Sequence, residues 1–289
     1  MSAIAVHSAL PDPLAGAAAA VLEAAGVAHV AHGGADPMRA AEAAAADPNA
    51  VALLGPFRSA EVKEALAATA PARLPLLAPV ATWAGITRDD EPCGDDDAPE
   101  HDGTVLRMVA RDTEVAVRIA ADVRASGRRA LVVAGDHEYG VQLDGQLELV
   151  GLPRAEAAGD ADLVVVCGLA DHPEMERAAA LAPLPVLAFD AVQGADLGPG
   201  RDVLVALPYG PENEAAMADG TLGARHARRA AELVVAALRG GAGDREAVLA
   251  ALRALGPFDA HGDPVGAPVW LWRAQPDWAL RPEREPPAA

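Results

Sequence analysis

The chain has 289 residues, 52% of them hydrophobic, which suits about two globular domains with sizeable cores. Its 42 acidic side chains outnumber 23 lysines and arginines and give a formal net charge of -19. Nucleic acid is therefore disfavoured as a partner, because such binding needs a clustered basic surface. Aromatic residues make up only 3%, so stacking platforms for bases or sugars are scarce.

The two cysteines do not have the spacing of a zinc site or a redox pair. Cys93 lies in an acidic segment and Cys167 ends an apolar run, so we predict no metal and no cofactor, with a chance disulfide left open. No secretory leader precedes the first expected strand, and no apolar run reaches membrane-spanning length. We expect a cytoplasmic protein without direct membrane insertion. The alternative is a periplasmic or extracellular lipoprotein whose leader has been removed.

Short apolar runs alternate with helical patterns in the first part of the chain. Strands are expected at residues 4–6, 27–31, 51–54 and 74–77. Helices are expected at residues 14–25, 36–46 and 59–71. Asp36 followed by Pro37 makes a good helix start. This repeated order predicts an α/β fold with a largely parallel sheet.

Residues 51–87 form one strand–helix–strand unit in which each strand leads to a loop that carries a hydroxyl. The first strand runs through Gly55-Pro56 to Ser59, and the second reaches Thr82. Because parallel strands share their carboxyl edge, both hydroxyls are expected there, where they and backbone N–H groups could seat a carboxylate. The alternative is that Ser59 only caps the helix and Thr82 only makes a turn.

An acidic segment follows at residues 87–103. We interpret it as a solvated loop and not as a calcium site, because it lacks the fixed alternation and the glycine of a calcium-binding loop. The change in composition suggests a domain boundary nearby.

The same alternation continues to the end of the chain. Extended segments are expected at residues 104–110, 130–134, 162–167, 185–188, 203–207 and 269–273. Helices are expected at residues 112–126, 221–239 and 245–255, with Asp112 and Asp244 as caps. Beyond Trp278 the Pro- and Glu-rich end is predicted to be disordered.

Several motifs together resemble the type I periplasmic binding proteins of the branched-chain amino-acid (Leu/Ile/Val) class. GPFRSAE followed by LPLLAPVATWAGIT resembles the ligand-binding signature of that family. DHEYG after the strand at 130–134 resembles the opening of its second lobe, and GPFDAHGD resembles its last turn. The resemblance covers about residues 36–273, and its specificity comes from the order and spacing of modest motifs.

This resemblance implies two Rossmann-like lobes joined by a three-crossover hinge. One lobe would hold residues 1–109 plus 210–255, and the other would hold 110–209 plus 256–289. A small amino-acid-like or carboxylate ligand would bind in the cleft, and the lobes would close on it.

The resemblance also assigns candidate ligand-binding residues. Ser59, Thr82 and the N–H of Ala81 would hold the anionic end of the ligand. Tyr139 would face the ligand from the second lobe, unless it only packs locally. Asp190, with Asp171 as a rival, would hold an amino group. Leu169-Ala170 replace a family aromatic, which weakens the case for a standard amino acid.

Two neighbours of the hydroxyl loops complete the candidate site. Arg58 could pair with a second acidic group on the ligand, or it could simply point outward from the surface. Trp83 could line the cleft or pack behind it.

Three functions are compatible with these features. The first is a solute-binding protein that works with an ABC transporter permease. The second is a cytoplasmic ligand sensor with a regulatory partner protein. The third, an enzyme using Asp136, His137, Glu138 and Tyr139, is disfavoured, because the chain contains no serine elbow, Walker loop, zinc triad or G-x-G-x-x-G. We therefore predict no catalytic residues.

Overall fold

A computed structural model describes residues 4–32, 36–87, 103–192, 195–197, 201–218, 222–275 and 279–284. Its contacts divide the chain into two compact units. Of the described residues, those before 111 and those from 222 to 267 form unit 1, and the others form unit 2.

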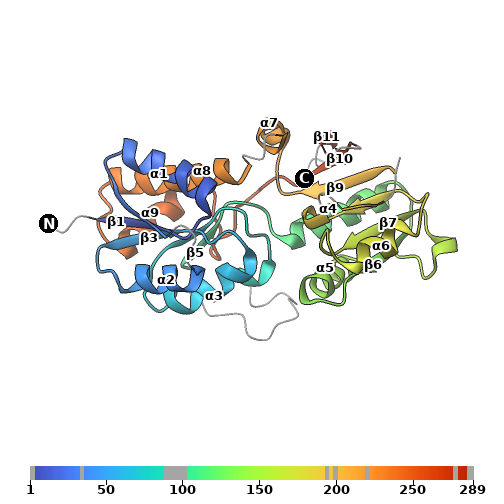
Figure 1. Ribbon diagram of the computed structural model, residues 1–289, viewed down its shortest axis with the longest axis horizontal. Helices are drawn as coiled ribbons and strands as arrows, with labels where there is room; N and C mark the ends of the chain where they lie inside the picture. The colour runs from blue at the N-terminus through green and yellow to red at the C-terminus, as the bar shows by residue number, and fades with distance from the viewer. Residues whose placement is uncertain are drawn as a thin grey trace. The chain divides into compact units, whose positions relative to one another are not determined.

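Unit 1 is built on a parallel five-stranded sheet in the order β2-β1-β3-β4-β5. Its strands are β1 (Ala5–Ser8), β2 (Ala28–Ala31), β3 (Ala50–Leu54), β4 (Leu76–Ala78) and β5 (Val105–Arg107). One face is covered by α1 (Asp12–Ala24), α8 (Leu222–Arg239) and α9 (Arg245–Leu255). The other face is covered by α2 (Pro37–Ala46) and α3 (Ser59–Thr69), as Figure 1 shows. A short 3-10 helix, η1 (Ala84–Ile86), follows β4.

Small side chains let the helices of unit 1 pack closely on the sheet. The alanine-rich α1 lies against α8, and the core between them and the sheet includes Val6, Leu22, Val234 and Leu252. Burying each such side chain contributes roughly 1.5–3 kcal/mol. Two predicted caps are confirmed, because Asp36 accepts the N–H of Met38 at 3.0 Å and Asp244 accepts that of Ala247 at 2.8 Å.

Arg245, the first residue of α9, holds together three backbone segments of unit 1. Its guanidinium donates to carbonyl oxygens at distances of 2.7–3.3 Å, those of Ala44, Ala45, Asp47, Ala50 and Ala72. Three of these carbonyls belong to the end of α2, where a helix leaves its last C=O groups without partners and favours a cation. The five planar donors of arginine suit this arrangement.

We expect Arg245→Met to lower the free energy of unfolding by about 2 kcal/mol, since hydrogen bonds from a charged donor are lost while the half-buried carbonyls regain some water. Urea denaturation would measure the change. Arg39→Met on the exposed face of α2 is the matched control and should change stability by less than about 0.5 kcal/mol. Equal effects of the two substitutions would contradict this role for Arg245.

Unit 2 contains a six-stranded sheet in the order β11-β10-β9-β8-β7-β6. Four parallel strands come first along the chain, β6 (Ala130–Ala134), β7 (Leu163–Cys167), β8 (Val186–Ala188) and β9 (Val203–Leu207). Antiparallel β10 (Trp270–Ala274) and β11 (Leu280–Arg284) extend the sheet beyond β9. Trp272 is fully buried and donates its indole N–H to the carbonyl oxygen of Tyr209 at 3.1 Å.

The helices of unit 2 are short except for the first two, which lie side by side. The α-helices are α4 (Asp112–Ala125), α5 (Glu138–Leu149), α6 (Pro173–Ala179) and α7 (Glu214–Ala218). The 3-10 helices are η2 (Ala158–Asp160), η3 (Asp190–Val192) and η4 (Pro211–Asn213). The predicted α/β class, with two lobes on mostly parallel sheets, is confirmed.

The three boundaries between the units differ from those that we expect from the sequence, the first by one residue, since Ala110 belongs to unit 1. Residues 210–218 belong to unit 2 and not to the first lobe, because α7 packs on β11 and Glu214 pairs with Arg281 at 2.5 Å. Residues 256–267 belong to unit 1 and not to the second lobe, because the backbone N–H of Arg107 donates to the carbonyl oxygen of Gly262 at 2.8 Å.

The predicted disorder beyond Trp278 is wrong for residues 280–284. They form β11, which pairs with β10, and Glu283 accepts a hydrogen bond from Arg273 at 2.8 Å. The acidic loop and Cys93 lie outside the described residues. Within the described ranges, none of the helices combines the length and apolar character of a membrane span.

Candidate functional site

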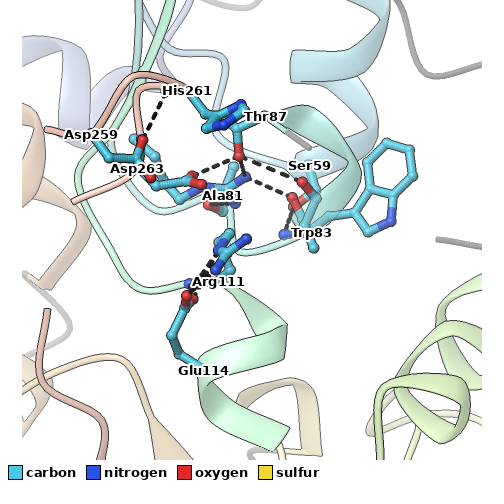
Figure 2. Close-up of polar contacts among 11 residues, drawn as sticks. Ser59, Ala81, Trp83, Thr87, Arg111, Glu114, Asp259, His261 and Asp263 are labelled. Atoms are coloured by element: carbon cyan, nitrogen blue, oxygen red, sulfur yellow. Dashed lines mark hydrogen bonds and ion pairs between the residues drawn. The ribbon is translucent and has the colours of Figure 1, made fainter. Parts of the chain in front are cut away.

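In unit 1, the two hydroxyl-bearing loops meet at the carboxyl edge of β3 and β4. Ser59 is the first helical residue of α3 and not its cap, because Arg58 occupies the cap position. The Ser59 Oγ instead accepts the backbone N–H of Trp83 at 3.3 Å, which ties the start of α3 to the loop after β4 (Figure 2). Ala81 and Thr82, 2% and 6% exposed, precede Trp83 in that loop. The structure thus brings together the unit 1 residues that the sequence singles out.

A fully buried arginine holds this loop in place. Arg107, at the end of β5, donates to the carbonyl oxygens of Ala81 and Trp83, both at 2.8 Å. Its guanidinium also contacts the Thr87 hydroxyl at 2.8 Å and a carboxylate oxygen of Asp263 at 3.1 Å. Sequence analysis does not identify Arg107 as important, because an arginine in a three-residue strand has no local signal of this role.

Thr87 and Asp263 close the same network from two distant parts of the chain. The Thr87 hydroxyl donates to Asp263 at 2.6 Å, as Figure 2 shows. Asp259 accepts the backbone N–H groups of His261 and Asp263 at 2.9 and 3.0 Å and so shapes the turn that presents Asp263. The GPFDAHGD motif therefore supports the loop at residues 81–87 from within unit 1.

The other two candidates in unit 1 occupy different environments. Arg58 is exposed, and its backbone N–H donates to Glu61 at 3.1 Å. Trp83 is 6% exposed, its ring points away from Thr87, and the Lys63 ammonium lies 5.0 Å from the ring centroid (Figure 2). A cation over an indole face is attractive, so this geometry favours packing beside α3.

In unit 2, the two predicted ligand-facing residues contact each other. Tyr139 lies in the first turn of α5, after β6, and Asp190 opens η3, after β8. The Tyr139 hydroxyl donates to Asp190 Oδ1 at 3.4 Å. The rival Asp171 has a side chain that is 90% exposed and lies 4.0 Å from His172. The geometry therefore favours Asp190 over Asp171 as the acidic partner of Tyr139.

Desolvation dominates the electrostatics around Tyr139. It raises the pKa of Asp190, although hydrogen bonds from Tyr139 and the backbone N–H of Ala191 partly offset it. Desolvation and the nearby charges of Asp112 and Asp190 raise the pKa of Tyr139 well above its ordinary value. The same causes raise the pKa of Tyr209. The ionised form of a carboxylate whose pKa is raised by desolvation is stabilised by a nearby cation.

Asp112 and Tyr209 are thus part of this cluster, and sequence analysis misses both roles. Asp112 is predicted to cap α4, but it is the first helical residue and is only 3% exposed. Tyr209 follows β9 and is 6% exposed. Tyr209 comes after a parallel strand of the unit 2 sheet, at the edge where ligand sites of α/β sheets gather, and this position is its signal. Asp112 follows a strand of the other sheet and has no such signal.

A search of solved structures found proteins with the same architecture. An ABC transporter substrate-binding protein from Desulfitobacterium hafniense, in complex with Leu, has a TM-score of 0.74 and 18% identity, with 97% of this chain and 99% of that chain covered. A leucine-binding protein from Thermotoga maritima has a TM-score of 0.72 and 15% identity, with 97% and 98% covered. A solute-binding protein from R. palustris, in complex with benzoate, has a TM-score of 0.70 and 15% identity, with 97% and 95% covered.

These similarities establish that the chain has the fold of type I periplasmic binding proteins. A scan against protein-family models and a search of curated proteins found no match.

Proposed function

We propose that the chain binds a small amino-acid-like or carboxylate ligand, which both units contact and on which they close. The observation that carries this proposal is the tied pair of loops in unit 1, where Ser59, Ala81 and Thr82 come together. Hydroxyl and backbone N–H donors at a sheet edge suit an anion. The ligands named for the structural neighbours, Leu, isoleucine, benzoate and 4-hydroxybenzoate, all carry a carboxylate, which supports this assignment.

Unit 2 supplies contacts of the opposite character. Asp190 and Tyr139 would hold a polar or cationic group at the other end of the ligand, and an ammonium would stabilise the ionised form of Asp190. Contacts that exist only when both units touch the ligand favour the closed form by the ligand's differential affinity. Arg58 and Trp83 flank the loops in this proposal and make no essential contact.

The neighbours are named as ABC transporter proteins, which supports a role in delivering the ligand to a transporter permease outside the cytoplasm. In this role the ligand leaves unchanged. To test whether the ligand is released unchanged, the protein is incubated with each ligand that it binds, and the solution is analysed by mass spectrometry. A new product would contradict a role in ligand delivery. Fractionation of the native cells would locate the protein.

We expect a thermal-shift screen of L-leucine, L-isoleucine, benzoate and 4-hydroxybenzoate, widened to other amino acids, carboxylates and amides, to yield a ligand that raises the melting temperature. Ser59→Ala combined with Thr82→Val should then weaken binding by about 3 kcal/mol, roughly a hundredfold, because two hydrogen bonds to a charged group are lost. Isothermal titration calorimetry would measure the affinity.

The matched control is Ser126→Ala in unit 2, whose hydroxyl donates to the carbonyl oxygen of Val123 at 2.8 Å at the end of α4. It should leave the affinity unchanged. A double variant that folds and binds as tightly as the wild type would show that the hydroxyl loops are not the carboxylate site.

A further inference from the structure

Three side chains that can bind a metal ion meet at the carboxyl edge of the unit 2 sheet. His137 follows β6, and His172 and Glu174 follow β7. One nitrogen of each imidazole and one carboxylate oxygen of Glu174 all lie within 4.8 Å of one another. His137 Nε2 is 2.8 Å from Glu174 Oε1, and the two imidazole rings meet edge to face with centroids 4.7 Å apart.

Two glycines, which have no Cβ, make room for the side chains of His137 and Glu174. A Cβ placed on Gly135, directly after β6, would lie 2.4 Å from His137 Nε2. A Cβ placed on Gly168, directly after β7, would lie 2.1 Å from Glu174 Oε1. Both distances are below the 3.0 Å that Cβ atoms keep from other atoms, so a side chain at either glycine would displace His137 or Glu174 from its present position.

Glu174 is held as a buried anion at this place. It is 1% exposed, and its Oε1 accepts the backbone N–H of Leu169 at 3.0 Å as well as the contact from His137. Burial raises its pKa, but these hydrogen bonds outweigh burial and the pKa is lowered overall. A buried carboxylate of this kind is stabilised by a paired cation or a metal ion.

We propose that His137, His172 and Glu174 form a binding site for a divalent transition-metal ion of the zinc class. Two imidazoles and one carboxylate are a ligand set that zinc accepts, and they leave a fourth position open to water or to a ligand. His172 can move to complete the site, because its side chain is 37% exposed. The inference stands apart from the proposed function and needs no organic ligand.

His137 must change its hydrogen bonds when the ion binds. Its Nδ1 accepts the backbone N–H of Gly140 at 3.2 Å, so the neutral ring carries its proton on Nε2 and donates it to Glu174. The ion takes the place of that proton, and a neutral ring then carries its proton on Nδ1, which gives up the bond from Gly140. Ion binding therefore loosens the first turn of α5, which carries Tyr139.

Titration of the full chain, free of affinity tags and stripped with a chelator, tests the site. Zn²⁺ competing with a chromophoric chelator should bind with a stoichiometry of one. Glu174→Gln and His172→Ala should each weaken it at least about a hundredfold, since even partners behind the ligands cost 10–100-fold when removed. Co²⁺ should give the intense visible absorption of a four-coordinate site in the wild type and lose it in both variants.

His29→Ala is the matched control, because His29 lies in unit 1, where its Nε2 is 3.8 Å from a carboxylate oxygen of Glu23. It should bind Zn²⁺ as the wild type does. Circular dichroism identifies any variant that fails to fold. If Glu174→Gln fails to fold, the test of the metal site rests on His172→Ala, which changes a half-exposed side chain. An absence of stoichiometric binding, or binding unaffected by His172→Ala, would overturn the site.

Discussion

Arg107→Met is expected to lower the free energy of unfolding of unit 1 by about 3–5 kcal/mol, the range found when one partner of a buried ion pair is removed. The guanidinium is fully buried and contacts Asp263, the Thr87 hydroxyl and two loop carbonyls. Methionine fills a similar volume but donates no hydrogen bond. The carboxylate of Asp263 would then stay buried without its counter-charge.

Hydrogen exchange measured by mass spectrometry would locate the effect, because peptides of unit 1 should lose protection first. Arg107→Lys keeps the charge but lacks the planar fork, so it should fall between the wild type and Arg107→Met. The exposed Arg58→Met beside the same loop is the matched control and should change stability by less than about 0.5 kcal/mol. A loss for Arg107→Met no larger than for Arg58→Met would refute the role of the network.

The network also explains how unit 1 positions its candidate site. Arg107 ends a strand three residues before the chain passes into unit 2, and Asp263 lies four residues before it passes again. Both contact the loop that carries Ala81 and Thr82, directly or through Thr87. The loop that carries Ala81 and Thr82 is therefore supported by the segments that contain Arg107 and Asp263. A change in the conformation of either segment would alter the position of this loop.

The alternation of apolar runs and helical patterns predicts the order of the elements well. Caps are equally readable where the side chain bonds within its own first turn, as Asp36 and Asp244 do. Ser59 and Asp112 look identical to caps in the sequence, yet both are the first helical residues. Ser59 bonds to a residue 24 positions away, which local patterns cannot reveal.

Contacts between distant residues account for the rest of what sequence analysis misses. Arg107 and Asp263 are separated by 156 positions, and His137 and Glu174 by 37. No spacing rule links such pairs, so the sequence alone does not bring them together. The later boundaries were misplaced for the same reason, because α7 and the turn at 256–267 are assigned by what they pack against.

Asp190→Asn is expected to weaken binding of ligands that carry an ammonium group by about 2–5 kcal/mol, roughly thirtyfold or more. The aspartate is partly buried against Tyr139, and burial disfavours its ionised form, which an ammonium would stabilise. The amide keeps the shape but has no charge. Affinity for benzoate, which has no ammonium, should change little. Calorimetric titration of both kinds of ligand would separate amino-acid binding from aromatic-acid binding.

The same substitution should raise the stability of the ligand-free protein at neutral pH. Because the folded pKa of Asp190 lies above its unfolded value, the ionised carboxylate opposes folding, and this cost disappears as the pH falls through the raised pKa. The advantage of Asp190→Asn should therefore shrink in acid, as melting temperatures across pH would show. Asp171→Asn, with a side chain 90% exposed, should change neither property. If Asp171→Asn weakened amino-acid binding and Asp190→Asn did not, the two aspartates would exchange roles.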